Sequence, residues 1–201
     1  MNQLKNRKAQ LSGVLIALIV IIALIFFVIL WAIGIYNALV QKDVAVEKAW
    51  GNVQTAYQRR VDLIPNLVET VKGVVKFEQD TQTKIAALRS GINSARNPDE
   101  LQAAGNQVNS YIRGLNINVE AYPDLKANQN FLSLQDELAG TENRIKWERD
   151  NFNGAVQSYK TSVRSFPTNF IAGMYGFNLD KWNMFKADEG AENAPKINFI
   201  G

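Results

Sequence analysis

The sequence predicts an all-α protein: an N-terminal transmembrane helix, an antiparallel up-down four-helix bundle and an irregular, aromatic C-terminal tail. One long apolar run follows the N-terminus, hydrophobic residues then recur at helical spacing, and prolines and polar runs divide the repeating region. No alternating strand pattern persists there. We therefore expect a basic tail at residues 1–12, a transmembrane helix at 13–36, a bundle at 37–166 and a C-terminal tail at 167–201.

The apolar run is long enough to cross a bilayer. From Gly13 to Ile35 every residue is apolar or glycine, which gives roughly 35 Å of helix against a hydrocarbon core of about 30 Å. The alternative is a cleaved signal peptide, but the apolar region of such a peptide is only about 7–15 residues long. Trp31 and Tyr36 lie where an interfacial aromatic belt is expected. We predict an uncleaved anchor with these two residues at the membrane interface.

Charged residues on the two sides of the run favour one orientation. Lys5, Arg7 and Lys8 precede the run, whereas Lys42 and Lys48 follow it. Because basic residues are retained on the cytoplasmic side, we expect a cytoplasmic N-terminus and a main domain outside. Lys5, Arg7 and Lys8 also account for the whole net charge of +3, because the chain has 22 basic and 19 acidic residues. The rest of the chain is neutral and predicts no nucleic-acid partner.

The first helix is expected to leave the membrane without a break and to end near Val61. Pro65 lacks a backbone N–H and restricts the residue before it, so we expect a turn at Asp62–Pro65 and a second helix after it. Apolar positions in both helices follow steps of three and four, and those of the second are coiled-coil-like. We call the set of positions on one side of a helix its seam. The seam of the first helix is Val46, Trp50, Val53 and Tyr57, and that of the second is Leu67, Val71, Val74, Glu78, Thr81, Ile85, Leu88 and Ile92.

Two more helices complete the predicted bundle. The run Asn97–Glu100 predicts a turn and a new helix start, and this third helix should end near Glu120, before Pro123. A fourth helix is expected from near Asn128 to Phe166-Pro167. Long helices with short connections are typical of an up-and-down bundle. The two seams are Leu101, Ala104, Val108, Tyr111 and Leu115, and then Phe131, Leu134, Leu138, Ile145, Phe152, Val156, Tyr159 and Val163.

The tail after Pro167 loses the helical pattern but stays rich in aromatic residues, among them Phe170, Tyr175, Phe177 and Trp182. This composition is too aromatic for a simply disordered segment. Two interpretations stay open. The tail packs back on the bundle, or it contacts the bilayer or a partner.

The residue types that are missing exclude much chemistry. The chain has no cysteine and no histidine, which removes disulfides, thiolate and imidazole metal sites, thiol nucleophiles and a Ser-His-Asp triad. It also has no glycine-rich phosphate loop and no metal-ligand motif. We therefore predict no catalytic, cofactor-binding or metal-binding residue, and no cofactor.

Charged residues beside the predicted turns are expected to pair with one another. A carboxylate inside a bundle needs a cation or a hydrogen-bond donor, and such pairs specify helix register. The expected bundle ion-pair network consists of Arg59, Arg60, Glu69, Glu78, Glu142 and Arg144. The alternative is a carboxylate-based hydrolase at the membrane surface, with acid and base roles for Asp62, Glu69, Glu78 or Glu142.

Up-and-down order places the turns at 62–65 and 122–128 together at the bundle end far from the bilayer. We expect these turns to form a partner-docking tip. The alternative is that the same residue types serve only as caps and turn residues, as is also expected of Asn143. The candidate tip consists of Asp62, Pro65, Asn66, Tyr122, Pro123, Asp124, Lys126 and Asn128.

Several runs of this sequence resemble the LemA family. They are Arg59–Gly73, Tyr122–Asn128, Thr141–Ile145 and Phe166–Asn169, and the resemblance extends from about Tyr36 to Phe199. It implies a single-pass membrane protein with an antiparallel helical bundle. It implies no established enzymatic activity, and the family includes proteins of the magnetosome membrane.

These observations predict a membrane-anchored helical-bundle scaffold or adaptor that presents a surface for protein partners or for self-assembly. The expected location is a bacterial cytoplasmic (inner) membrane, crossed once. The expected partners are the lipid bilayer and either further copies of the chain or other membrane proteins. We do not expect an enzyme.

Overall fold

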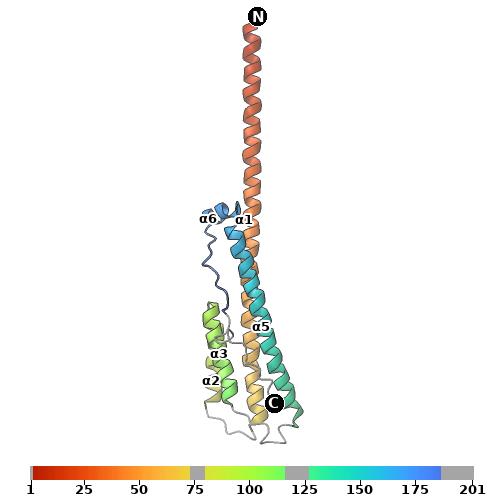
Figure 1. The fold of residues 1–201 in the computed structure, drawn as a ribbon, viewed down its shortest axis with the longest axis vertical. Helices are drawn as coiled ribbons and strands as arrows, with labels where there is room; N and C mark the ends of the chain where they lie inside the picture. The colour runs from red at the N-terminus through yellow and green to blue at the C-terminus, as the bar shows by residue number, and fades with distance from the viewer. Residues whose placement is uncertain (1, 73–79, 116–126, 187–201) are drawn as a thin grey trace, which may run out of the picture. The chain divides into compact units, whose positions relative to one another are not determined.

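The computed structural model describes residues 2–72, 80–115 and 127–186. Within these ranges the elements are helices without any strand, which confirms the predicted all-α class (Figure 1). The elements are α1 (Asn2–Val71), α2 (Thr81–Ser94), α3 (Pro98–Gly114), α5 (Gln129–Arg164) and α6 (Thr168–Tyr175).

The chain folds as two compact units. The first unit comprises Met1–Val44 and Tyr159–Leu179, and the second comprises Ala45–Ser158 and Asp180–Gly201. In the described part of the chain, one helix is long and apolar enough to cross a membrane, and it is the apolar part of α1. Its large apolar side chains from Leu15 to Ile33 are exposed, as a membrane anchor requires.

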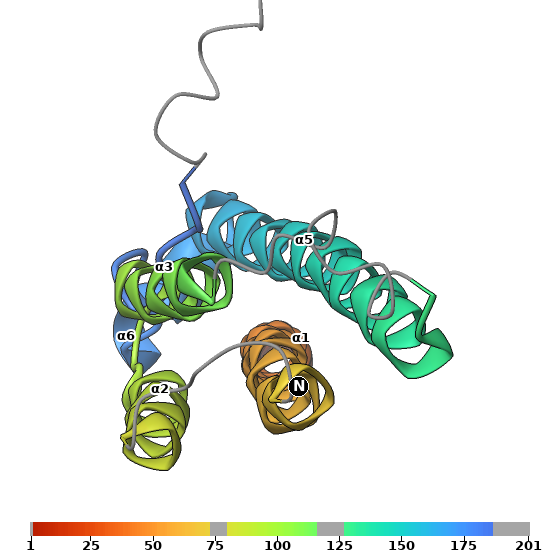
Figure 2. The ribbon, with the colours of Figure 1, turned by 90° about the horizontal axis from the view of Figure 1, so that it is seen from below.

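One side of α1 is buried within the second unit. Val46, Val53, Tyr57 and Val61 follow one another at helical spacing and are all buried. The other helices of this unit lie around this side, as the end-on view shows (Figure 2). The elements succeed one another in the order that an up-and-down bundle needs, and the complete four-helix bundle stays a prediction.

Contacts from α2, α3 and α5 all reach α1. Gln54 Nε2 on α1 donates to the carbonyl of Ala95, the residue that follows α2, at 3.2 Å. The Trp50 ring lies 5.5 Å from the Phe152 ring of α5. A further apolar cluster joins the end of α1 to α5 and to the residue after α3, through Leu67, Val71, Leu115 and Phe131.

The predicted turn at Asp62–Pro65 is wrong, because α1 continues through Pro65 to Val71. A proline inside a helix removes one backbone hydrogen bond and costs about 3 kcal/mol or more. Ile64 and Leu67, which flank Pro65 on the same side of α1, are both buried. Burial of these side chains outweighs the local preference for a break. The first two seam residues assigned to the second helix therefore belong to α1.

The other predicted helix starts are confirmed by their caps. Asn97 Oδ1 accepts from the backbone N–H of Glu100 at 2.9 Å, and the Glu100 carboxylate accepts from the N–H of Arg96 at 2.8 Å. The two bonds cap the start of α3, and they resemble a capping box in which Glu100 reaches the residue before the N-cap. Asn128 Oδ1 accepts from the N–H groups of Asn130 at 3.0 Å and Phe131 at 3.2 Å, and α5 begins there. The predicted end of the third helix lies outside the described residues.

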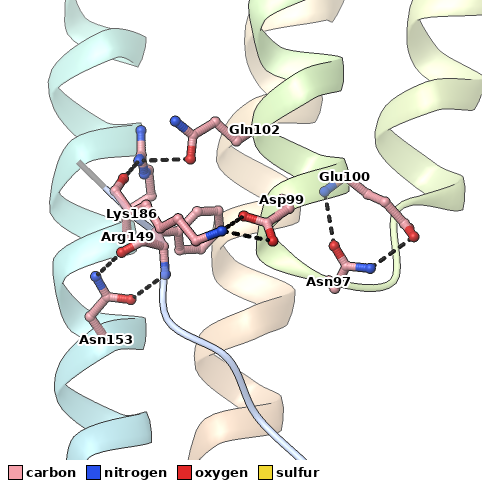
Figure 3. Close-up of polar contacts among 8 residues, drawn as sticks. Asn97, Asp99, Glu100, Gln102, Arg149, Asn153 and Lys186 are labelled. Carbon is pink, nitrogen blue, oxygen red and sulfur yellow. Dashed lines mark hydrogen bonds and ion pairs between the residues drawn. The ribbon is translucent and has the colours of Figure 1, made fainter. Parts of the chain in front are cut away.

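The last described residues, which belong to the second unit, contact α3 and α5 (Figure 3). Asn153 Nδ2 donates to the carbonyl of Phe185 at 3.2 Å, and the Phe185 N–H donates to Asn153 Oδ1 at 2.8 Å. Arg149 donates to the carbonyl of Lys186 at 2.9 Å. Lys186 Nζ pairs with the Asp99 carboxylate of α3 at 3.2 Å. These contacts hold the segment in an extended form and direct Phe185 inward.

The inward-facing Phe185 completes an aromatic core. Its ring lies 5.5 Å from Phe152 on α5 and 6.2 Å from Trp50 on α1. The Trp182 ring lies 6.4 Å from Phe152 on another side. Two residues of the C-terminal segment therefore join α1 and α5 in a shared apolar cluster.

Gly105 of α3 packs against the Tyr57 ring of α1. A Cβ atom placed there would lie 3.1 Å from Cδ1 and Cζ of Tyr57, and closer still to Cε1. We predict that Gly105→Ala lowers the free energy of unfolding by about 1–3 kcal/mol, because the buried ring must move. Chemical denaturation followed by circular dichroism would measure it. The control is Gly154→Ala in α5, where, among the described residues, no packing neighbour lies within 4 Å of an added Cβ atom, and it should be neutral or stabilising. Equal stability of the two variants would contradict the packing of Gly105 on Tyr57.

Candidate functional site

A groove of about 570 Å³ lies between α1 and α5 in the second unit. On each helix its lining residues recur every three or four positions, with one adjacent pair on each, so they occupy one face. We call this feature the α1–α5 groove. It is lined by Asn52, Thr55, Ala56 and Arg59 from α1, and by Glu137, Gly140, Thr141, Arg144 and Glu148 from α5.

Glu148 supplies a buried carboxylate to the groove. Its side chain is only 2% exposed, and its Oε1 accepts from the Arg144 guanidinium at 2.7 Å. Its Oε2 is buried and has no hydrogen-bond partner among the described residues. Leaving a buried acceptor unsatisfied costs about 1–3 kcal/mol, and more when the group is charged. The groove is therefore lined by a carboxylate whose second oxygen lacks a donor among the described residues.

The other polar side chains of the groove differ in whether they have an interaction partner among the described residues. The Thr141 hydroxyl is buried and donates to the carbonyl of Leu138 at 2.7 Å. The Arg144 guanidinium lies 4.7 Å from the Trp147 ring centre, a cation–π contact. Arg59 is exposed and has no hydrogen bond or ion pair within the described ranges. A bound segment could thus meet an acceptor at Glu148 and a cation at Arg59.

Sequence reasoning did not identify Thr141 or Glu148, although the seam of α5 contained the signal. The steps from Leu138 through Thr141, Ile145 and Glu148 to Phe152 alternate between three and four residues. Thr141 and Glu148 are therefore polar residues at seam positions seven apart. Polar residues at core positions need partners, so this pair could have been selected as a candidate site.

The predicted tip residues are only partly described, and those that are described do not form two turns. Asp62, Pro65 and Asn66 lie within α1. Asp62 accepts from Gln58 at 3.0 Å and from Arg89 of α2 at 2.9 Å, so it connects two helices. Asn128 caps α5. The remaining members lie outside the described residues: Tyr122, Pro123, Asp124 and Lys126. The docking role of the tip stays a prediction.

The predicted ion-pair residues form separate pairs within the described part of the chain. Arg60 of α1 pairs with Glu142 of α5. Glu69 pairs with Lys72 at 3.5 Å on the surface of the same segment. Arg144 pairs with Glu148, as described above. Glu78 lies outside the described residues.

Three of the four carboxylates considered for a hydrolase are therefore ion-paired, each with a different cation. Asp62 has Arg89, Glu69 has Lys72 and Glu142 has Arg60. No two of these three acids share a cation. Among the described residues, no group of three or more histidine, cysteine, aspartate or glutamate side chains is arranged to hold a metal ion.

The two predicted membrane-interface residues lie in the first unit. Trp31 is exposed. The Tyr36 ring lies 4.9 Å from the Tyr175 ring of α6 and 5.8 Å from the Phe177 ring. Tyr36 therefore connects α1 to α6.

The fold and the site define a class of all-helical protein whose N-terminal apolar helix fits a membrane anchor and whose second unit carries a groove between α1 and α5. The family model of the LemA family matches residues 49–199. The chain belongs to the LemA family.

Similar proteins agree with this assignment. Protein LemA of Metamycoplasma hominis is 29% identical over 163 residues, which cover 78% of this chain and 71% of that protein. Magnetosome proteins MamQ 2 and MamQ 1 of Paramagnetospirillum magneticum are each 29% identical over 59 residues. Those matches cover 29% of this chain and 22% of each magnetosome protein.

The Arg144–Glu148 pair yields a stability prediction. Arg144→Ala should lower the free energy of unfolding by about 1–3 kcal/mol, because the buried Glu148 carboxylate then loses its donor. Glu148→Leu should leave stability unchanged or raise it by about 1–4 kcal/mol, because an apolar side chain of similar size suits a seam position.

A double-mutant cycle checks this prediction. In the Glu148→Leu background, Arg144→Ala should cost little, since no buried charge remains to be satisfied. Strictly additive effects of the two substitutions would contradict the pairing. A large loss of stability from Glu148→Leu alone would show that the carboxylate is needed for folding.

Proposed function

We propose that this protein is a membrane-anchored adaptor whose α1–α5 groove binds a segment of a partner protein. The apolar part of α1 serves as the anchor. The proposal is non-enzymatic and involves no nucleic acid. The observation that supports it is the buried Glu148 oxygen, which has no hydrogen-bond donor among the described residues and belongs to a residue that lines the groove.

The chemistry of the groove defines the partner segment that would fit. Glu148 Oε2 favours a donor such as a backbone N–H, a lysine ammonium or an arginine guanidinium. Arg59, which has no ion pair among the described residues, favours a carboxylate of the same segment. A segment with a donor and an acid therefore matches both. Another membrane protein or a second copy of this chain could supply it.

We further propose that the anchor lies in a bacterial cytoplasmic membrane with the N-terminus inside. Lys5, Arg7 and Lys8 before the apolar run outnumber Lys42 and Lys48 after it, which supports this orientation. The second unit would then lie outside the cytoplasm.

A photo-crosslinking residue in the groove would test partner binding. We predict that p-benzoylphenylalanine at Thr55, which is exposed on the groove wall, gives a discrete crosslinked product in intact membranes. The product should disappear in the Glu148→Leu background, because the acceptor for the partner's donor is then gone. Denaturing electrophoresis and mass spectrometry would measure it.

The matched control carries the same residue at Ala86, an exposed position on α2 outside the groove. It should give no such product. A product of twice the monomer mass would identify a second copy as the partner. A product that persists in folded Glu148→Leu protein would overturn the role of Glu148.

The orientation can be measured because the natural chain has no cysteine. We predict that Ala86→Cys reacts with a membrane-impermeant maleimide in intact, outer-membrane-permeabilised cells. Its side chain is exposed, and the second unit is expected outside. Reaction only after lysis of the inner membrane would reverse the proposed orientation.

A further inference from the structure

The segment after α5 presents an apolar stripe to solvent. The chain carries no charged residue from Ser165 to Leu179, and α6 lies within this span. Phe166 precedes α6, and Phe170 and Met174 lie four residues apart on one side of that helix. They are 79%, 64% and 77% exposed. The rings of Phe166 and Phe170 lie 5.9 Å apart, edge to face. We call these three side chains the α6 stripe.

The opposite side of α6 is held in place, so the stripe is presented on an ordered element. Ala172 is buried, and its carbonyl accepts from the N–H groups of both Gly176 and Phe177. Gly176 adopts a φ of 78°, the left-handed conformation that suits glycine at a helix end. The helix therefore ends in a defined cap, with one side inward and the stripe outward.

The position of α6 within the first unit indicates what covers the stripe. The Tyr175 and Phe177 rings contact Tyr36 of α1, and α6 lies beside α1 (Figure 1). Tyr36 follows Trp31 at the end of the apolar run, about 7.5 Å further along the helix axis. The polar zone of each leaflet is about 5–8 Å thick. When the run spans a bilayer, α6 therefore lies at the depth of the interface.

We propose that the α6 stripe inserts into the lipid surface beside the anchor and gives the protein a second membrane contact. This inference rests on the anchor of the proposed function. Tyr175, the neighbour of Met174 in sequence, contacts Tyr36 of α1, which follows the exposed apolar run. The absence of charge around the stripe suits the boundary between headgroups and acyl chains. At this boundary Phe and Met side chains insert into the apolar region, and Tyr stays at the polar edge. A bilayer is therefore its occupant.

Fluorescent labels on single cysteines measure this contact in the full chain, reconstituted in phosphatidylcholine vesicles. An environment-sensitive NBD label is placed at Met174→Cys, on the stripe, and at Asn169→Cys, on another side of the same helix. Leu24→Cys, in the middle of the apolar run, reports anchor insertion, and Ala86→Cys reports an aqueous position. Lipids with shallow or deep spin labels, and aqueous iodide, serve as quenchers.

Quenching of the Met174 label by shallow spin-labelled lipid should exceed that of the Asn169 label by about twofold or more. Its emission should be blue-shifted, and iodide should quench it less than the Ala86 label. A Phe170→Cys label should behave like the Met174 label. Circular dichroism verifies that each variant keeps its helix content.

Three results would overturn the inference, and they separate it from the anchor. If deep spin labels quench Leu24 while Met174 resembles Ala86, the anchor stands and the stripe contact fails. If lipid does not quench Leu24, the anchor itself fails. If Met174 is shielded from iodide but not quenched by lipid, protein covers the stripe, either a second copy or another partner.

Discussion

Burial of one side of α1 is the interaction on which the second unit depends. The seam from Val46 to Val71 receives contacts from α2, α3, α5 and the C-terminal segment. Because every neighbour packs on the same helix, a change in its register would disturb all of these contacts together. This dependence explains why α1 continues through Pro65. The lost hydrogen bond is a local cost, whereas a break would expose several buried side chains.

The seam of α5 contains two polar residues, Thr141 and Glu148. The α1–α5 groove lies at these two positions, where apolar packing is interrupted. Thr141 satisfies its hydroxyl within its own helix. One oxygen of Glu148 accepts from Arg144, and the other has no partner in the described part of the chain. A core built only for stability would place an apolar residue there, since buried ion pairs add little to stability. The carboxylate is the feature on which the proposed binding role of the groove rests.

The residues after Pro167 are divided between the two units and have two kinds of environment. Trp182 and Phe185 join an aromatic core, with their backbone held by Asn153 and Arg149. Phe166, Phe170 and Met174 are exposed beside the end of an apolar run. By composition both segments are aromatic and irregular, so composition alone does not distinguish them. Their different burial follows from which part of α1 and α5 each segment meets.

The sequence by itself determined the features that depend on neighbouring residues. The apolar run, the helical class and the caps at Asn97 and Asn128 all follow from local spacing and local hydrogen bonds. The tertiary structure decided the path of α1 through Pro65, the burial of Glu148 and the exposure of the α6 stripe. Pro65 is tolerated because distant side chains bury its neighbours. Glu148 is buried at a seam position of α5, beside the α1–α5 groove. Such contacts join residues far apart in the chain, and the periodicity of one segment does not reveal which distant segment will cover it.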